Sequence, residues 1–165
     1  MGARLDVVPT KHDERAVAGW VDWFVPPPLT RRRIVHVALA LVNESGLRRL
    51  TFDRLAGHLS VTPEVLRHHI ADRAELIDAL VDHVHALVLD RDAPVGPAAG
   101  LDAARHLLAR HREIWSAHRP LIAAHGRGVL PGPATDELVD RLTGALRAAG
   151  LDRHEARTTG PLLLQ

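Results

Sequence analysis

The stretch that decides the fold runs from Leu50 to Leu76 and reads LTFDRLAGHLSVTPEVLRHHIADRAEL. Thr51 stands where the N-cap of a short helix is expected, and apolar residues then follow at the spacing of one helix face: Phe52, Leu55, Ala56 and Leu59. Ser60-Val61 forms a turn, Thr62 caps the next helix, and Pro63 occupies its first position, where a missing N–H costs nothing. The pattern predicts two short helices joined by a tight turn.

A longer helix is expected directly before this stretch. Thr30 is its N-cap, Arg31–Arg33 form its first turn, and Gly46 ends it in a left-handed conformation. Its inward residues step by three and four: Ile34, Val37, Ala38, Leu41 and Val42. Three helices of which the last two meet at a tight turn form a helix-turn-helix unit, whose third helix is presented to the major groove of DNA.

The residues after this unit predict further helices. Asp72 and Glu75 are spaced as a capping box for a helix that runs to about Asp90, and the Pro- and Gly-rich residues up to Gly100 mark a loop. Amphipathic segments follow at about 101–117, 121–125 and 135–149. Asp152 and Glu155 open a last helix, which Gly160-Pro161 is expected to break.

Composition agrees with an all-α protein. The chain has 165 residues, 46% of them hydrophobic, with no Tyr and two Phe, so the aromatic residues that favour strands are scarce. Because there is no Cys, disulfides and thiolate chemistry are excluded. No run approaches the roughly 18 apolar residues of a membrane span, and the start lacks a signal-peptide pattern, so we expect a cytoplasmic protein.

Charge is concentrated around the opening stretch. Residues 29–73 carry eight Arg against four acidic residues, a net charge of +4, whereas residues 1–28 and 74–165 have net charges of −1 and −2. A basic segment joined to a slightly acidic remainder favours a polyanionic partner for that segment.

Residues 29–80 resemble the DNA-binding domain of TetR-type transcriptional regulators. The similarity rests on Gly46, Leu50-Thr51, Leu55-Ala56, Leu59-Ser60-Val61-Thr62, Leu66, His69-Ile70, Arg73 and Leu76. The chain departs from the family's usual residues at Ser60 (most often Gly), Arg67 (Tyr), His68 (frequently aromatic) and Arg73 (Lys). None of these departures removes a residue that the fold needs.

The resemblance implies a DNA-binding surface. Six residues would face DNA, and Thr51 and Arg73 would hold phosphates on either side; the six are Thr62, Glu64, Val65, Arg67, His68 and His69. Arg67 can bind guanine O6 and N7 in a bidentate manner, and Val65 can contact a thymine methyl group. The structural alternative is that Thr51 and Thr62 are only caps, that His69 is packed, and that Glu64 serves the helix dipole.

The resemblance also implies a division of the chain and a partner. Residues 1–28 form an N-terminal extension with Trp20, Trp23 and Phe24, residues 29–75 the DNA-binding domain, and residues 76–165 a partial ligand-binding and dimerisation domain. We expect a repressor that binds a palindromic operator as a homodimer and is released by a small-molecule effector. Because the chain stops at Gln165, where the family continues with long helices, dimerisation stays open. Candidate pocket walls are Leu87, Leu108, Trp115, Leu121 and Ile122, with ordinary core packing as the alternative.

The sequence has features of two other classes of protein, a metal binder and a protein-interaction module. Twelve histidines suggest a metal site, but Pro120 interrupts the helix that would align His111, His118 and His125, and His83 and His85 at i, i+2 point apart. No metal, cofactor or catalytic motif is predicted. A helical protein-interaction module and, less favoured, a His-based metal binder remain the alternatives to a DNA-binding regulator.

Overall fold

A computed structural model describes residues 28–89, 100–125 and 130–164, and in this part of the chain all regular structure is helical. The predicted fold class, all-α, is confirmed; Trp20, Trp23 and Phe24 lie outside the described residues. The elements are α2 (Arg31–Ser45), the 3₁₀ turn η2 (Leu47–Arg49), α3 (Phe52–Leu59), α4 (Pro63–Arg67), α5 (Arg73–Val88), α6 (Gly100–Ala117), α7 (Arg119–His125), α8 (Pro133–Ala148) and α9 (Arg153–Leu162). None of the helices in these ranges is long and apolar enough to cross a membrane.

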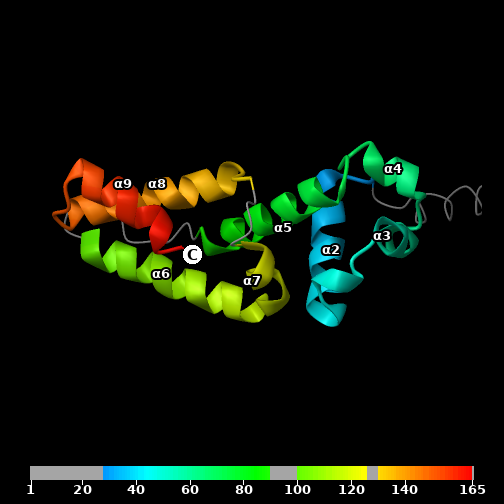
Figure 1. The fold of residues 1–165 in the computed structure, drawn as a ribbon, viewed down its shortest axis with the longest axis horizontal. Helices are drawn as coiled ribbons and strands as arrows, with labels where there is room; N and C mark the ends of the chain where they lie inside the picture. The colour runs from blue at the N-terminus through cyan, green and yellow to red at the C-terminus, as the bar shows by residue number, and fades with distance from the viewer. Residues whose placement is uncertain (1–27, 90–99, 126–129, 165) are drawn as a thin grey trace, which may run out of the picture.

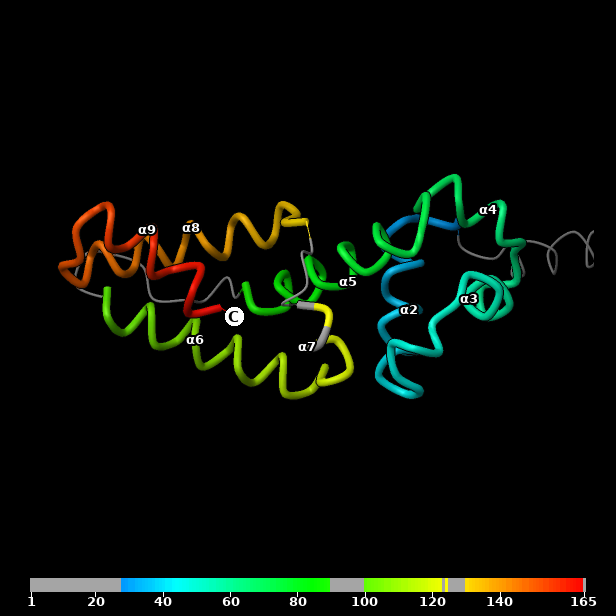
Figure 2. Tube along the Cα trace, viewed as in Figure 1, coloured from blue at the N-terminus to red at the C-terminus, as the bar shows by residue number. Residues whose placement is uncertain are grey.

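The molecule is elongated, with different helices at its two ends (Figures 1 and 2). Helices α2, α3 and α4 form one end, which we call the helix-turn-helix unit, and α6, α8 and α9 lie together at the other end. Helix α5 leaves the first group and runs towards the second, and α7 packs against α2, α5 and α6 near the middle. We refer to α6–α9 as the body.

Helix starts follow the predicted capping residues in most cases. Thr30 and Thr51 each accept a hydrogen bond, at 3.2 Å, from the backbone N–H three residues on, and Asp152 with Glu155 forms a complete capping box. The box predicted for Asp72 and Glu75 is only half correct. Asp72 accepts from Glu75 N at 2.9 Å, but the Glu75 carboxylate accepts from Ala71 N rather than from Asp72 N.

The predicted break at Gly160-Pro161 is wrong, because α9 continues through Pro161 to Leu162. Pro161 lies in the last turn of the helix, so its missing N–H removes only one intrahelical hydrogen bond. Gly160 is buried, and a Cβ atom built there would lie 2.9 Å from Thr143 Oγ1. The glycine therefore allows α9 to approach α8 closely.

Helix α5 contributes to both hydrophobic clusters of the described chain. The first contains the inner faces of α2, α3 and α4 together with Leu76, Leu80, Val81 and Val84 of α5. The second begins at Val88 and contains buried residues of α6, α8 and α9. Trp115 of α6 and Leu121 of α7 belong to the first cluster, so the body and the helix-turn-helix unit share buried apolar surface. The domain boundary predicted after Glu75 stays a prediction.

A polar contact fixes α8 on α5. Gly132, at the N-cap of α8, has no side chain to cap the helix, and the Asp82 carboxylate of α5 accepts from Thr135 N at 2.9 Å and from Thr135 Oγ1 at 3.0 Å instead. A Cβ atom at position 132 would lie 2.4 Å from Asp82 Cγ. The buried ring of His85 places Nδ1 2.8 Å from the same Thr135 hydroxyl oxygen. Because that hydroxyl donates to Asp82, it accepts from the His85 Nδ1–H.

Close packing at the far end of the body leads to the first prediction. A Cβ atom at Gly100 would lie 2.5 Å from the backbone of Ala148 and Ala149, whereas one at Gly144 would meet nothing within 4 Å. Gly100→Ala should therefore lower the free energy of unfolding by about 1–3 kcal/mol, because the backbone of α8 cannot move away cheaply. Gly144→Ala, in a helix interior, should raise it by about 0.5–1 kcal/mol. Urea denaturation followed by circular dichroism measures both, and equal effects of the two changes would contradict this account.

Histidines gather where α5 meets α2 and α7. Burial lowers the pKa of His83 below its ordinary value of 6.5, and the nearby positive groups of His36, Arg32 and His118 lower it further, while Asp82 opposes them. Burial also lowers the pKa of His118, whose Nδ1 lies 3.1 Å from Asn43 Oδ1. As the pH falls through about 6.5, the unfolded chain therefore binds more protons at these two histidines than the folded chain does. Their contribution to the free energy of unfolding is fully present above that pH and is lost as the pH falls below it.

We expect the melting temperature to fall between pH 7.5 and pH 5.5, and His83→Gln to reduce this fall, because glutamine does not titrate. The matched control is His154→Gln, at an exposed position of α9. Thermal melts of the three proteins by circular dichroism at both pH values test the prediction. A fall that is unchanged in His83→Gln and reduced in the control would refute it.

Candidate nucleic-acid interface

The turn between α3 and α4 depends on a left-handed residue. Ser60 has φ 56° and ψ 42°, and within the described residues no other non-glycine residue has a positive φ. The N–H groups of Ser60 and Val61 donate to carbonyls of the last turn of α3, Val61 to Ala56 O at 3.1 Å. Such a conformation suits glycine best, which is the physical reason why glycine is the usual residue at this position in TetR-type proteins, and Ser60 adopts it against the preference of an L side chain.

Helix α4 presents almost all its side chains outward. It has five residues, and within it Leu66 alone is fully buried, with Ile70 buried just after its end. Of the residues predicted to face DNA, Thr62, Glu64, Val65, Arg67 and His68 are exposed, whereas His69 is half-buried. The structure therefore brings five of the six together on one exposed segment.

Arg67 lies on this surface with two weak intramolecular partners. Its guanidinium lies 5.5 Å from the centre of the Phe52 ring and 3.6 Å from the Glu64 carboxylate. Both side chains of the ion pair are more than half exposed, and such pairs contribute about 0–1 kcal/mol. Arg67 can therefore leave Glu64 for a stronger acceptor at little cost.

Glu64 has a structural role at the start of α4. Its own backbone N–H, the Thr62 hydroxyl and the Arg67 charge, in that order, lower the pKa of its carboxyl group, so the group is ionised at neutral pH. Thr62 occupies the N-cap position but accepts no capping hydrogen bond, so the predicted capping role of its hydroxyl is wrong; the hydroxyl bonds to Glu64. A carboxylate at the second helical position also interacts favourably with the helix dipole.

Arg73, predicted to hold a phosphate, is engaged with the backbone. Its guanidinium donates to the carbonyl of Leu47 at 2.8 Å and to the carbonyl of Leu50. These bonds tie the start of α5 to the residues that lead into α3, next to Thr51, whose own hydroxyl accepts from Arg54 N. A guanidinium has five N–H donors, so donors remain for a phosphate, and the phosphate roles of Thr51 and Arg73 stay predictions.

A second link joins the first helix to the same region. Arg31 forms an ion pair with Glu75 and donates to the carbonyl of His69 at 2.9 Å. The Glu75 carboxylate also accepts from Ala71 N at 2.6 Å, and this bond and Arg31 lower the pKa of Glu75. The loop between α4 and α5 is therefore held from α2.

Arg48 and Arg49 are not among the residues that the sequence predicts for this interface. They form the end of η2, directly before Leu50-Thr51, are exposed, and make no ion pair with another described residue. The charge of the segment was a signal for them, but the turn that places them beside the start of α3 was not predicted. Two exposed guanidinium groups at this position are suited to phosphate contacts.

The five proposed pocket residues differ in burial within the described part of the chain. Leu121 and Trp115 are buried in the first hydrophobic cluster and Leu108 is half-buried against the second, while Leu87 and Ile122 are exposed. Trp115 and Ile122 share a hollow of about 710 Å³ between α6 and α7. The other lining residues of this hollow are Arg112, Ser116 and Arg119.

Two histidines, His85 of α5 and His111 of α6, pack with each other and with Trp115. The His85 and His111 rings are stacked with centres 5.8 Å apart, and Trp115 meets His85 edge-on at 5.5 Å. In the ranges that the structure describes, no three His, Asp or Glu side chains are grouped so that they could hold a metal ion. The side chain of His125 lies outside the described part.

The fold thus defines a helix-turn-helix unit joined by one connecting helix to a helical body. No family model matches the chain. Among solved structures, it is similar to the TetR family protein ActR of Streptomyces coelicolor in complex with actinorhodin, with a TM-score of 0.74 and 31% identity, over 84% of this chain and 64% of ActR.

Among curated proteins, the chain is 28% identical over 147 residues to an HTH-type transcriptional regulator of Saccharopolyspora erythraea, covering 84% of this chain and 61% of that protein. It is 25% identical over 126 residues to the HTH-type transcriptional repressor DrrR1 of Streptomyces coeruleorubidus, covering 76% of this chain and 46% of DrrR1. The chain therefore spans about half to three-fifths of the length of these curated relatives. It belongs to the TetR family of transcriptional regulators.

Proposed function

We propose that this protein is a sequence-specific DNA-binding transcriptional regulator, a repressor that a small-molecule effector releases from its operator. The observation that carries the proposal is α4, whose exposed residues surround one buried anchor, Leu66, on a helix-turn-helix unit. The exposed Arg48 and Arg49 supply positive charge just before the start of α3, the helix that packs against α4. In this role α4 enters the major groove, with Val65, Arg67 and His68 at the base edges.

The operator proposed is a palindrome bound by a homodimer, as half-sites one helical turn apart require two helix-turn-helix units. Its sequence can be obtained by selecting bound duplexes from a random pool. Recovery of an inverted repeat would support both the specificity and the dimer, and recovery of unrelated sequences would contradict both.

Arg67 and Arg73 provide a test of the interface, because the structure gives them different surroundings. We expect Arg67→Ala to weaken binding to the selected duplex about 10- to 100-fold without lowering the melting temperature, since one bidentate base contact is worth roughly 1–3 kcal/mol. Arg73→Ala should weaken binding and also lower the melting temperature, because the carbonyls of Leu47 and Leu50 lose their donor. Fluorescence anisotropy and thermal melts measure the two effects.

Arg105→Ala is the matched control for both changes, since Arg105 is an exposed arginine of α6, paired at 3.7 Å with Asp102, far from α4. It should change neither affinity nor melting temperature. Unchanged duplex binding in both Arg67→Ala and Arg73→Ala would refute the proposed interface.

The effector site proposed is the hollow at Trp115 and Ile122. It is lined largely by an aromatic and an aliphatic side chain with two arginines, which suits a planar apolar molecule with acidic groups. Helix α7, which forms one wall, also packs on α2 and α5, and Trp115 shares a cluster with the helix-turn-helix unit. A molecule bound there would contact α7, and α7 in turn packs on the helix-turn-helix unit through α2 and on the connecting helix α5.

Actinorhodin, which the similar protein ActR binds in its solved structure, is a suitable probe. We expect actinorhodin to bind, and Ile122→Ser to raise its Kd several-fold. The substitution removes part of the apolar surface that the ligand buries, and each Å² of such surface contributes roughly 25 cal/mol. Leu101→Ser is the matched control, as Leu101 and Ile122 are equally exposed at 51%. Isothermal titration calorimetry measures the affinities, and equal losses in the two variants would rule out this hollow.

A further inference from the structure

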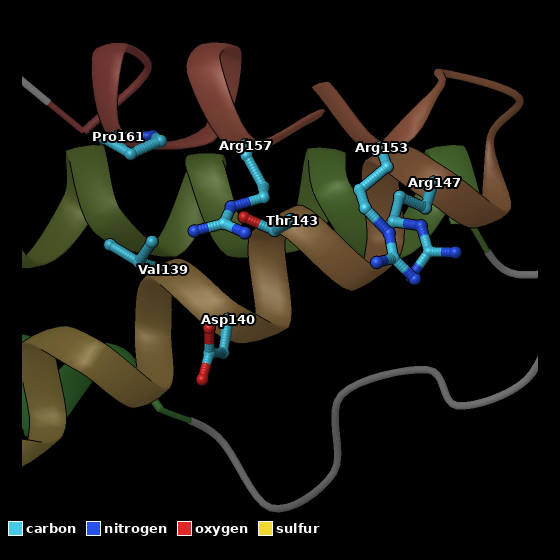
Figure 3. Close-up of a pocket in the computed structure, with 7 residues that line it drawn as sticks. All are labelled: Val139, Asp140, Thr143, Arg147, Arg153, Arg157 and Pro161. Atoms are coloured by element: carbon cyan, nitrogen blue, oxygen red, sulfur yellow. The ribbon is translucent and has the colours of Figure 1, made fainter. Parts of the chain in front are cut away.

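A second hollow lies between α8 and α9, and three arginines line it (Figure 3). It measures about 540 Å³, within the range of about 300–1,000 Å³ that ligand pockets span. Arg147 comes from the last turn of α8, and Arg153 and Arg157 come from α9. Thr143 supplies a hydroxyl group, and the one carboxylate in its lining is that of Asp140.

The three guanidinium groups have no anionic partner in the described part of the chain. Neither an ion pair nor a hydrogen bond engages the side chain of Arg147, Arg153 or Arg157 there, whereas elsewhere on α8 Arg141 pairs with Glu137 at 2.5 Å. Residues 74–165 have a net charge of −2, so a shortage of acidic residues does not explain this grouping.

The backbone positions that carry the arginines are fixed by a well-defined corner of the fold. Gly150, with φ 109°, turns the chain after α8, and the capping box of Asp152 and Glu155 fixes the start of α9. Further along α9, the buried Gly160 lies against Thr143 of α8. The hollow is therefore formed by two helices whose spacing is set by packing rather than by a loose loop.

The arrangement is unfavourable without an anion. Arg153 and Arg157 are four residues apart on one helix, where like charges destabilise. Arg153 is also the first residue of α9, where a positive charge opposes the helix dipole. A bound oxyanion would remove both penalties, and guanidinium groups bind phosphate and carboxylate through paired N–H donors.

We propose that this hollow binds a small polyanion, a molecule that carries two or more phosphate or carboxylate groups close together. The site lies at the opposite end of the molecule from α3 and α4, so it is separate from the proposed operator surface (Figure 1). It also differs from the apolar hollow at Trp115 and Ile122, which is lined by α6 and α7. The bound anion would join α8 to α9.

Calorimetric titration of the full chain with inorganic pyrophosphate, at constant ionic strength and without divalent cations, tests the proposal. We expect one site per chain, and about a tenfold or greater loss of affinity in the double variant Arg153→Gln/Arg157→Gln, which loses two charge-assisted contacts. The double variant Arg105→Gln/Arg141→Gln is the matched control, since it removes two exposed arginines of the body that pair with Asp102 and Glu137 and do not line the hollow, and it should bind as the parent does.

Asp140→Asn gives a test that misfolding cannot imitate. Removal of the one carboxylate in the lining should strengthen pyrophosphate binding about threefold or more, because a like charge is lost beside the anion. A parallel titration with citrate identifies the group that is bound, since a carboxylate ligand gives heat with citrate and a phosphate ligand with pyrophosphate.

Three outcomes would overturn the proposal. The first is that neither pyrophosphate nor citrate binds, and the second is that both arginine double variants lose affinity equally, which would show general attraction to positive charge. The third is that Arg153→Gln/Arg157→Gln weakens binding to duplex DNA as strongly as the interface variant Arg48→Gln/Arg49→Gln does. That result would make the hollow a nucleic-acid surface. Because anion binding and DNA binding are measured separately, failure of one proposal leaves the other standing.

Discussion

The burial of Leu66 is the constraint on which the exposed surface of α4 depends. A helix of five residues cannot be stable through its own hydrogen bonds, since isolated helices below roughly 12–15 residues are marginal in water. Leu66 is fully buried, and truncating such a residue to alanine typically costs about 2–5 kcal/mol. One side chain thus anchors α4, and the neighbouring residues are left exposed for another molecule.

Hydrogen bonds and an ion pair made by two arginines fix the segments on either side of α3 and α4. Arg73 holds the residues before α3 against the start of α5, and Arg31 of α2 holds the loop that follows α4 through His69 O and Glu75. Both arginines donate to backbone carbonyls at the borders of short elements, where intrahelical partners are scarce. The exposed surface of α4 is therefore positioned from behind by charged groups that need not take part in the proposed DNA contacts.

The sequence predicts local structure well and long-range contacts poorly. Helix faces and caps depend on residues three or four apart, and so α2, α3, α4 and the capping box of α9 could be predicted. The cap of α8 could not, because Asp82 lies 53 residues from Thr135 in the chain. The break predicted at Pro161 is wrong for a related reason. The effect of a proline depends on where the helix ends, and packing against α8 decides the end of α9. In the interface, exposure of Arg67 followed from helix spacing, whereas the backbone contacts of Arg73 did not.

In the proposed regulator, coupling between the body and the helix-turn-helix unit would act through shared packing. Helix α5 belongs to both hydrophobic clusters, and Trp115 and Leu121 place body residues in the first one. A complete switch from 1:99 to 99:1 requires a ligand to prefer one state by roughly 5.5 kcal/mol. A half-exposed contact such as Ile122 supplies only part of this, so an effector must also alter the burial of Trp115 or Leu121. Because close-packed interiors resist gradual deformation, such a change would shift α7 against α2 as a unit.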